Sequence, residues 1–120
     1  MDGLLNLFKP TGLTSAKALY QVRKFIGVRR SGHAGALDPA AEGVLLICLG
    51  RATKLVEALM NLPKVYHAVA RLDATSLSFD SEVPPEPVHV AQPPSADEVR
   101  AAGRKLEGVI WQTPPAISAL

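Results

Sequence analysis

The sequence has little cysteine and no long apolar run, and each shortage excludes a class of protein. Cys48 is the only cysteine among 120 residues, so neither an internal disulfide framework nor a zinc site built from cysteines can form. No apolar run approaches the roughly 20 residues needed to cross a bilayer. The start of the chain lacks the basic leader and apolar stretch of a signal peptide. We therefore expect a soluble cytoplasmic protein.

Net charge is also small, but it is unevenly distributed. The whole chain carries +2, whereas residues 1–71 hold ten basic and four acidic side chains and residues 72–120 hold three basic and seven acidic ones. A basic N-terminal half fits a polyanionic partner, although solvated surface charges give the same pattern. Hydrophobic residues make up 48% of the chain, which excludes an intrinsically disordered protein.

Apolar spacing and turn residues predict strands that alternate with helices. Strands are predicted at 3–8, 44–49, 64–72 and 109–112. Helices are predicted from Thr14 or Ser15 to Ile26, over 51–61, and from Ser95 to Gly108. The run at 44–49 is continuous enough to be buried on both faces, and the proline-rich stretch 84–95 is an extended connector. This alternation predicts an α/β (α+β) fold with a mixed β-sheet flanked by helices.

The stretch that carries most chemistry is 32–39, with the sequence Gly-His-Ala-Gly-Ala-Leu-Asp-Pro. Two glycines let the backbone approach a ligand closely and expose its N–H groups. Arg29 and Arg30, just upstream, are candidate phosphate partners. Asp38 stands before a proline, which favours an extended backbone, and nearby cations keep a carboxylate ionised for work as a nucleophile or base. Taken alone, an Asp-Pro pair is more commonly a turn, and such a histidine a surface hydrogen-bonding group.

Four blocks in order resemble the TruB family, the pseudouridine synthases that modify uridine 55 in the T loop of transfer RNA. They are residues 3–15 with their Lys-Pro turn, residues 32–54 with Gly-His-Ala-Gly-Ala-Leu-Asp-Pro and Cys-Leu-Gly-Arg-Ala-Thr-Lys, residues 64–72 with Lys-Val-Tyr, and residues 112–119 with Thr-Pro-Pro-Ala. The resemblance runs along almost the whole chain and implies a pseudouridine synthase-like fold.

The resemblance also implies a role for individual residues. Asp38 is implied to be the catalytic aspartate of a reaction that breaks the glycosidic bond of a uridine, turns the base over and rejoins it through carbon, without cofactor or metal. Covalent addition and removal of a sugar proton both remain open for this carboxylate. His33 is implied to fill the gap left by the extruded nucleotide, and Tyr66 to stack on the flipped base. Candidate contacts to the RNA backbone are Lys9, Arg29, Arg30 and Lys64.

Several positions depart from the pattern of the family. Glu42 brings a negative charge close to Asp38, and we expect this charge to repel that carboxylate or a phosphate. Asp73 and Val83 replace glycines, and Leu77 replaces an acidic residue, so the bend of this loop differs from the family's.

The family's catalytic domain is longer than this chain. We therefore expect residues 1–120 to be the N-terminal portion of that domain, with the connector 84–95 inside it and the C-terminal RNA-binding domain absent. The piece alone is expected to be inactive and poorly stable, because a sheet without all its strands leaves open edges. The expected partner is the T arm of transfer RNA, with no membrane, no metal and a monomeric state.

Two other functions remain open. A guide-dependent ribosomal RNA pseudouridine synthase shares the same block around Asp38. A non-catalytic RNA-binding module, such as the product of a truncated gene, would use the glycines at 32–35 as a phosphate clamp, although the apolar strand predicted after them counts against a KH-type loop.

Overall fold

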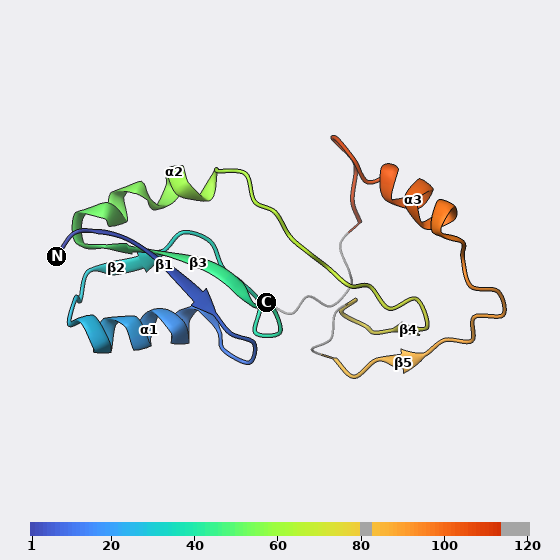
Figure 1. Cartoon of the computed structure of the whole chain (residues 1–120), viewed down its shortest axis with the longest axis horizontal. Coiled ribbons are helices and arrows are strands. Elements are labelled where there is room, and N and C mark those ends of the chain that lie inside the picture. Colours follow the sequence, from blue (N-terminus) through green and yellow to red (C-terminus); the bar gives the residue numbers. More distant parts are fainter. Residues whose placement is uncertain (80–82, 114–120) are drawn as a thin grey trace. The chain divides into compact units, whose positions relative to one another are not determined.

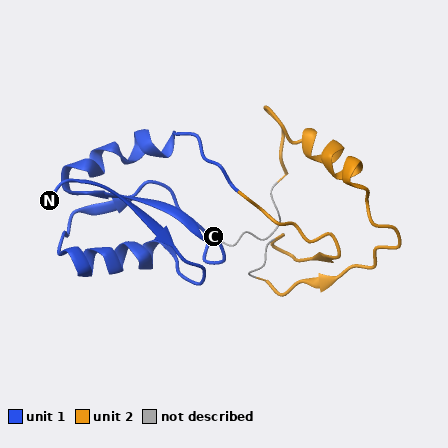
Figure 2. Cartoon of the chain, viewed as in Figure 1, with its two compact units in different colours: residues 1–66 blue, residues 67–120 orange. Residues whose placement is uncertain are grey.

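The computed structural model describes residues 1–79 and 83–113 (Figure 1). Its elements in chain order are β1 (Gly3–Lys9), α1 (Ser15–Ile26), β2 (Ser31–His33), β3 (Gly43–Leu49), the 3-10 helix η1 (Gly50–Leu55), α2 (Val56–Met60), β4 (Ala74–Thr75), β5 (Glu86–Pro87) and α3 (Ala96–Arg104). They form two compact units, residues 1–66 and 67–120 (Figure 2). The α/β (α+β) class is confirmed, but every strand pair in the described residues is antiparallel, where a mixed sheet was predicted.

The first unit is built on a three-stranded sheet in the order β1-β3-β2. The central strand β3 pairs along its full length with β1, from Gly3 opposite Leu49 to Lys9 opposite Gly43. The short strand β2 lies within the stretch predicted as a loop and pairs with the other edge of β3. An apolar central strand flanked by two neighbours satisfies its backbone on both sides.

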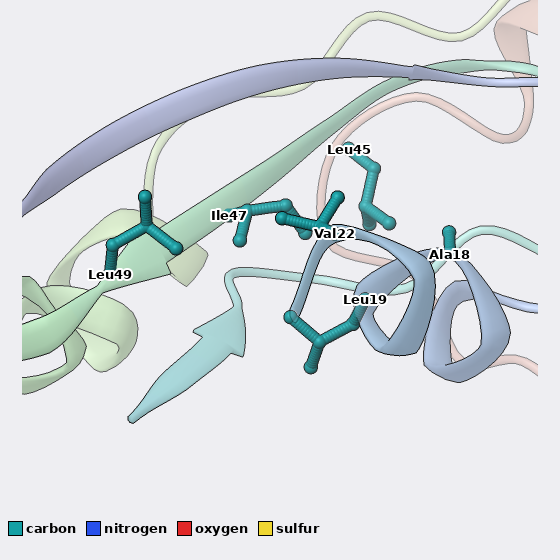
Figure 3. Packing of buried hydrophobic residues seen from close by; sticks show 6 residues of the cluster. All are labelled: Ala18, Leu19, Val22, Leu45, Ile47 and Leu49. Carbon is teal, nitrogen blue, oxygen red and sulfur yellow. The ribbon is translucent and has the colours of Figure 1, made fainter. Parts of the chain in front are cut away.

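One face of this sheet is covered by α1, and the hydrophobic core lies between them (Figure 3). Alternate residues of a strand point to the same face, and those of β3 meet residues of α1 that recur at helical spacing. The buried cluster consists of Ala18, Leu19, Val22, Leu45, Ile47 and Leu49.

The prediction that 44–49 is buried on both faces is wrong. Val44, on the other face of β3, is 69% exposed, whereas Cys48 further along is fully buried. Figure 1 shows η1 and α2 on the side of the sheet opposite α1, and a side-chain carbon of Val56 lies 3.9 Å from where a Cβ on Gly32 would stand. The second face is therefore covered only near the Cys48 end.

The ends of α1 follow the sequence. Thr14 is the N-cap, and its hydroxyl accepts a hydrogen bond from the backbone N–H of Lys17 at 3.1 Å. Gly27 ends the helix in the left-handed conformation, with φ of 73°, and its N–H donates to the carbonyl of Arg23. The predicted helix over 51–61 is instead the 3-10 helix η1 followed by a single turn of α-helix in α2.

The start of the chain is tied to the start of η1 by Asp2. Its carboxylate accepts hydrogen bonds from the backbone N–H and the side-chain Nε of Arg51, at 2.8 and 2.6 Å. These bonds hold the pKa of Asp2 below its usual value, since they stabilise the ionised form. Gly50 adopts φ of +56°, and a Cβ there would collide with Asp2 Oδ1 and the carbonyl oxygen of Met1.

Replacing Gly50 with alanine should therefore destabilise the protein by about 2–3 kcal/mol, because a left-handed backbone and a blocked side-chain site act together. Gly27→Ala is the matched control, since that glycine has φ of +73° but open space around a Cβ. It should cost only about 1 kcal/mol. Urea unfolding of both variants measures the difference. Equal losses would show that the contact with Asp2 does not constrain this position.

In the second unit, the capping box predicted at Ser95 and Glu98 is confirmed, with both hydrogen bonds formed. The helix that it starts, α3, ends at Arg104 and not at the predicted Gly108. The predicted strands 64–72 and 109–112 are wrong: neither stretch pairs with another described segment. Their apolar side chains include Val69 and Trp111, both fully exposed. A strand needs a paired neighbour, and alternation alone does not supply one.

Most of the fourth block, 114–119, lies outside the described residues, so nothing in the structure bears on it. No helix in the part of the chain that is described is long and apolar enough to cross a membrane.

Candidate functional site

Asp38 lies in the loop that joins β2 to β3, and its side chain is exposed. Its carbonyl oxygen accepts a hydrogen bond from the N–H of Ala41 at 3.1 Å, which closes a turn. Within residues 1–79 and 83–113, the Asp38 carboxylate makes no hydrogen bond or ion pair. A charged oxygen pair on a defined turn, open to solvent, is available to an incoming substrate.

Three hydrogen-bonded anchors hold this loop to the segment between β1 and α1. The hydroxyl of Ser15 accepts from the N–H of Leu37 at 2.8 Å and lies 3.0 Å from its carbonyl oxygen, to which it donates. The N–H of Gly12 donates to the carbonyl of Pro39 at 2.7 Å. The ammonium of Lys9 donates to the carbonyl of Ala41, also at 2.7 Å. The Asp38 loop is therefore fixed on both sides of the aspartate.

The prediction that Lys9 contacts the RNA backbone is wrong. Its side chain is fully buried, and its ammonium donates to the carbonyl oxygens of Pro10, Leu13 and Ala41. An ammonium has three donors, so all of them are used inside the protein. Lys9 instead cross-links the Lys-Pro turn to the loop that carries Asp38.

His33 ends β2 and is partly buried, opposite Ile47 of β3. Its Nδ1 atom is shielded from solvent and has no hydrogen-bond partner among the described residues. The next residue, Ala34, donates its N–H to the carbonyl of Leu46 at 2.8 Å, which extends the pairing into the start of the loop. His33 thus stands where the sheet passes into the Asp38 loop.

Lys64 is brought to the glycine loop from the end of α2. Its Cε lies 3.9 Å from where a Cβ on Gly35 would stand, so a larger residue at 35 would contact the lysine. The ammonium donates to the carbonyl oxygens of Met60 and Leu62, which caps the C-terminal end of α2. The side chain remains exposed and lies beside Gly35.

Arg29 and Arg30 are exposed in the link between α1 and β2. Arg30 donates from Nε to the hydroxyl of Thr53 at 3.1 Å, and its carbonyl accepts from the N–H of Gly50. Arg29 makes no hydrogen bond or ion pair with any residue that the structure describes. Both guanidinium groups are on exposed residues, and the backbone of Arg30 is held by its hydrogen bond from Gly50.

Tyr66 lies beyond α2 on an extended segment and is 69% exposed. Its ring is accessible for stacking, but no hydrogen bond joins it to the described residues around Asp38. The structure therefore brings Lys64 beside Gly35, in the loop that carries Asp38, and gives no comparable contact for Tyr66 among the described residues. The described residues contain no cluster of three metal-ligating side chains.

The sequence does not single out Ser15 as a residue of the site. It offers Ser15 as an alternative cap for α1 and as the last residue of the block 3–15, and Thr14 performs the capping role. The available signal was the second hydroxyl: two adjacent hydroxyl residues at a helix start leave one of them without a capping partner.

Comparisons with known proteins identify the family of the chain. A model described as the TruB family pseudouridylate synthase (N terminal domain) matches residues 23–120. Similar proteins include those named tRNA pseudouridine synthase B from Lacticaseibacillus paracasei and Clostridium acetobutylicum, each 43% identical over the whole of this chain. The chain spans about two fifths of the length of these curated relatives, 40% and 41%.

A solved structure has a similar fold. The crystal structure of a Cbf5-Nop10-Gar1 complex matches 98% of this chain and 30% of the other, with a TM-score of 0.62 and 28% sequence identity. The family match covers most of the chain, including the loop with Asp38, and the relatives match it from end to end. The chain therefore belongs to the TruB family of pseudouridylate synthases.

Proposed function

We propose that the protein containing this chain converts uridine to pseudouridine in the T loop of transfer RNA, at position 55. The observation that carries the proposal is the family match over residues 23–120, which includes an exposed Asp38 on a hydrogen-bonded turn. The relatives named tRNA pseudouridine synthase B support transfer RNA as the substrate.

The reaction is an isomerisation. The bond between N1 of uracil and C1′ of the ribose breaks, the base turns over, and C5 bonds to C1′ while the proton on C5 leaves and N1 gains one. Asp38 starts the reaction, either by adding to the substrate or by taking a proton from the sugar, and both need an ionised carboxylate open to the substrate. No oxidant or reductant is consumed.

The uridine must leave the base stack before a carboxylate can reach it. In this proposal Tyr66 stacks on the extruded base and compensates part of the unstacking energy, and His33 occupies the gap in the RNA. Arg29, Arg30 and Lys64 bind phosphates, which is supported by their exposure and by the excess of basic residues in the first 71.

The test uses the full-length polypeptide that the gene encodes, with transfer RNA carrying tritium at C5 of uridine. Because C5 loses its proton in the reaction, we expect tritium release at one site per molecule, absent when uridine 55 is replaced by cytidine. No release, or release that persists after this replacement, would refute the proposal.

The same assay separates the second enzymatic candidate. This candidate is a synthase that works with other components, and the structural similarity to a protein of the Cbf5-Nop10-Gar1 complex supports it. A bare T-arm stem-loop, supplied without any other RNA or protein, is expected to be a substrate. A requirement for an added guide RNA would instead assign the chain to the guide-dependent class.

A further inference from the structure

Ser15 occupies an unusual place for a hydroxyl residue. It is the first residue of α1, directly after the N-cap Thr14, and it is 5% exposed. A serine here commonly bonds within its own helix. The hydroxyl of Ser15 instead leaves the helix and makes both of its hydrogen bonds to Leu37, 22 residues further along the chain.

The two bonds satisfy both backbone hydrogen-bonding groups of Leu37. A hydroxyl is both a donor and an acceptor, so a single oxygen satisfies the N–H of Leu37 at 2.8 Å and its carbonyl at 3.0 Å. The carbonyl of Leu37 belongs to the peptide plane that also contains the N and Cα atoms of Asp38. Holding that carbonyl therefore fixes where the backbone of Asp38 begins.

A second anchor fixes the far side. The N–H of Gly12 donates to the carbonyl of Pro39 at 2.7 Å, and the proline ring restricts the backbone of the residue before it. Ser15 is itself fixed, since α1 is held by its buried residues Ala18, Leu19 and Val22. On its N-terminal side, the Asp38 loop is thus tied to α1 and the hydrophobic core by the hydroxyl of Ser15.

We propose that Ser15 is a positioning residue that holds Asp38 in its reactive geometry, an inference that rests on the proposed function. Ser15 bonds to Leu37 from α1. The proposed phosphate contacts, Arg29, Arg30 and Lys64, lie on other segments of the chain. Loosening Leu37 therefore lowers the rate of the chemical step more than it lowers RNA binding. A displacement of about 1 Å in a reacting group costs up to about 100-fold in rate.

The experiment compares three variants of the full-length polypeptide in single-turnover and steady-state tritium-release assays. Ser15→Ala should lower kcat by about 10- to 100-fold and leave KM within about twofold. Ser15→Thr retains the hydroxyl and should keep kcat within about threefold of the parent. Thr14→Ala is the matched control, since it removes the neighbouring hydroxyl and weakens the same helix without touching Leu37.

Stability and activity are separated by the control. If Ser15→Ala and Thr14→Ala lose kcat equally, or if Ser15→Ala raises KM alone, Ser15 is only a structural residue and the inference is overturned. Should Ser15→Ala not fold, Ser15→Cys takes its place with the same expectation, because a thiol of similar size is a weaker hydrogen-bond partner.

Hydrogen exchange tests the positioning independently of catalysis. The N–H of Leu37 should exchange faster in Ser15→Ala than in the parent and remain protected in Thr14→Ala. Unchanged protection in Ser15→Ala overturns the inference. If the parent protein forms no pseudouridine, the proposed function fails, and the exchange result still decides whether Ser15 holds the Asp38 loop.

Discussion

Asp38→Asn in the full-length polypeptide should lower pseudouridine formation by at least about 1,000-fold while leaving transfer RNA affinity within about threefold. The amide has nearly the shape of the carboxylate but can neither add to a sugar carbon nor take a proton from one. Because the carboxylate makes no bond within residues 1–79 and 83–113, its loss should leave the loop in place. Tritium release measures the rate, and filter binding measures the affinity.

Glu42→Gln is the matched control for charge. It removes a carboxylate only four residues from Asp38, also on an exposed side chain. It should keep the rate within about threefold, since the charge of Glu42 acts on the reaction only at a distance, through electrostatic repulsion. If the two variants lose activity equally, negative charge in this loop matters and Asp38 has no particular chemical role.

The same pair of measurements separates an enzyme from a binding module. Retained affinity with lost modification supports catalysis by Asp38. If the parent protein binds transfer RNA tightly but leaves it unmodified, the non-catalytic alternative is supported. RNA affinity of the parent should fall steeply with added salt, because each phosphate contact releases counterions.

The first unit of the fold could be predicted well from the sequence because its signals are local and agree with one another. The apolar run 44–49 predicts β3. The helical spacing of apolar residues, a hydroxyl cap at its start and Gly27 at its end together predict α1. The short strand β2 gave no such signal. Its pairing comes from its contact with β3, which no pattern within three residues can reveal.

The predicted strand 64–72 shows why alternation was insufficient. Its apolar and polar residues alternate, but an alternating segment becomes a strand only when a neighbour pairs with its backbone. None of the described segments does so here, and Tyr66 and Val69 stay exposed. Because the pairing of this segment cannot be predicted from its own residues, the sequence does not predict where Tyr66 lies relative to Asp38.

The candidate site shows a different limit. A motif places Asp38 and His33 in one loop, since they are five residues apart. It does not show what holds that loop, because the anchors at Gly12 and Ser15 come from more than twenty residues away and use backbone atoms and a hydroxyl. It also does not separate a basic residue that binds phosphate from one that is buried, and Lys9 proved to be the second kind.

Lys9→Met in the full-length polypeptide should lower the free energy of unfolding by about 2–4 kcal/mol, because the carbonyls of Pro10, Leu13 and Ala41 lose their shared donor in a buried place. Lys17→Met is the matched control: Lys17 is an exposed lysine of α1 whose ammonium makes no hydrogen bond among the described residues, and its loss should change stability by no more than about 0.5 kcal/mol. Urea unfolding measures both. Since Lys9 is inside the protein, the dependence of RNA affinity on salt should be the same as in the parent. If Lys9→Met keeps the stability of the parent and its RNA affinity depends less steeply on salt, Lys9 is a phosphate contact after all.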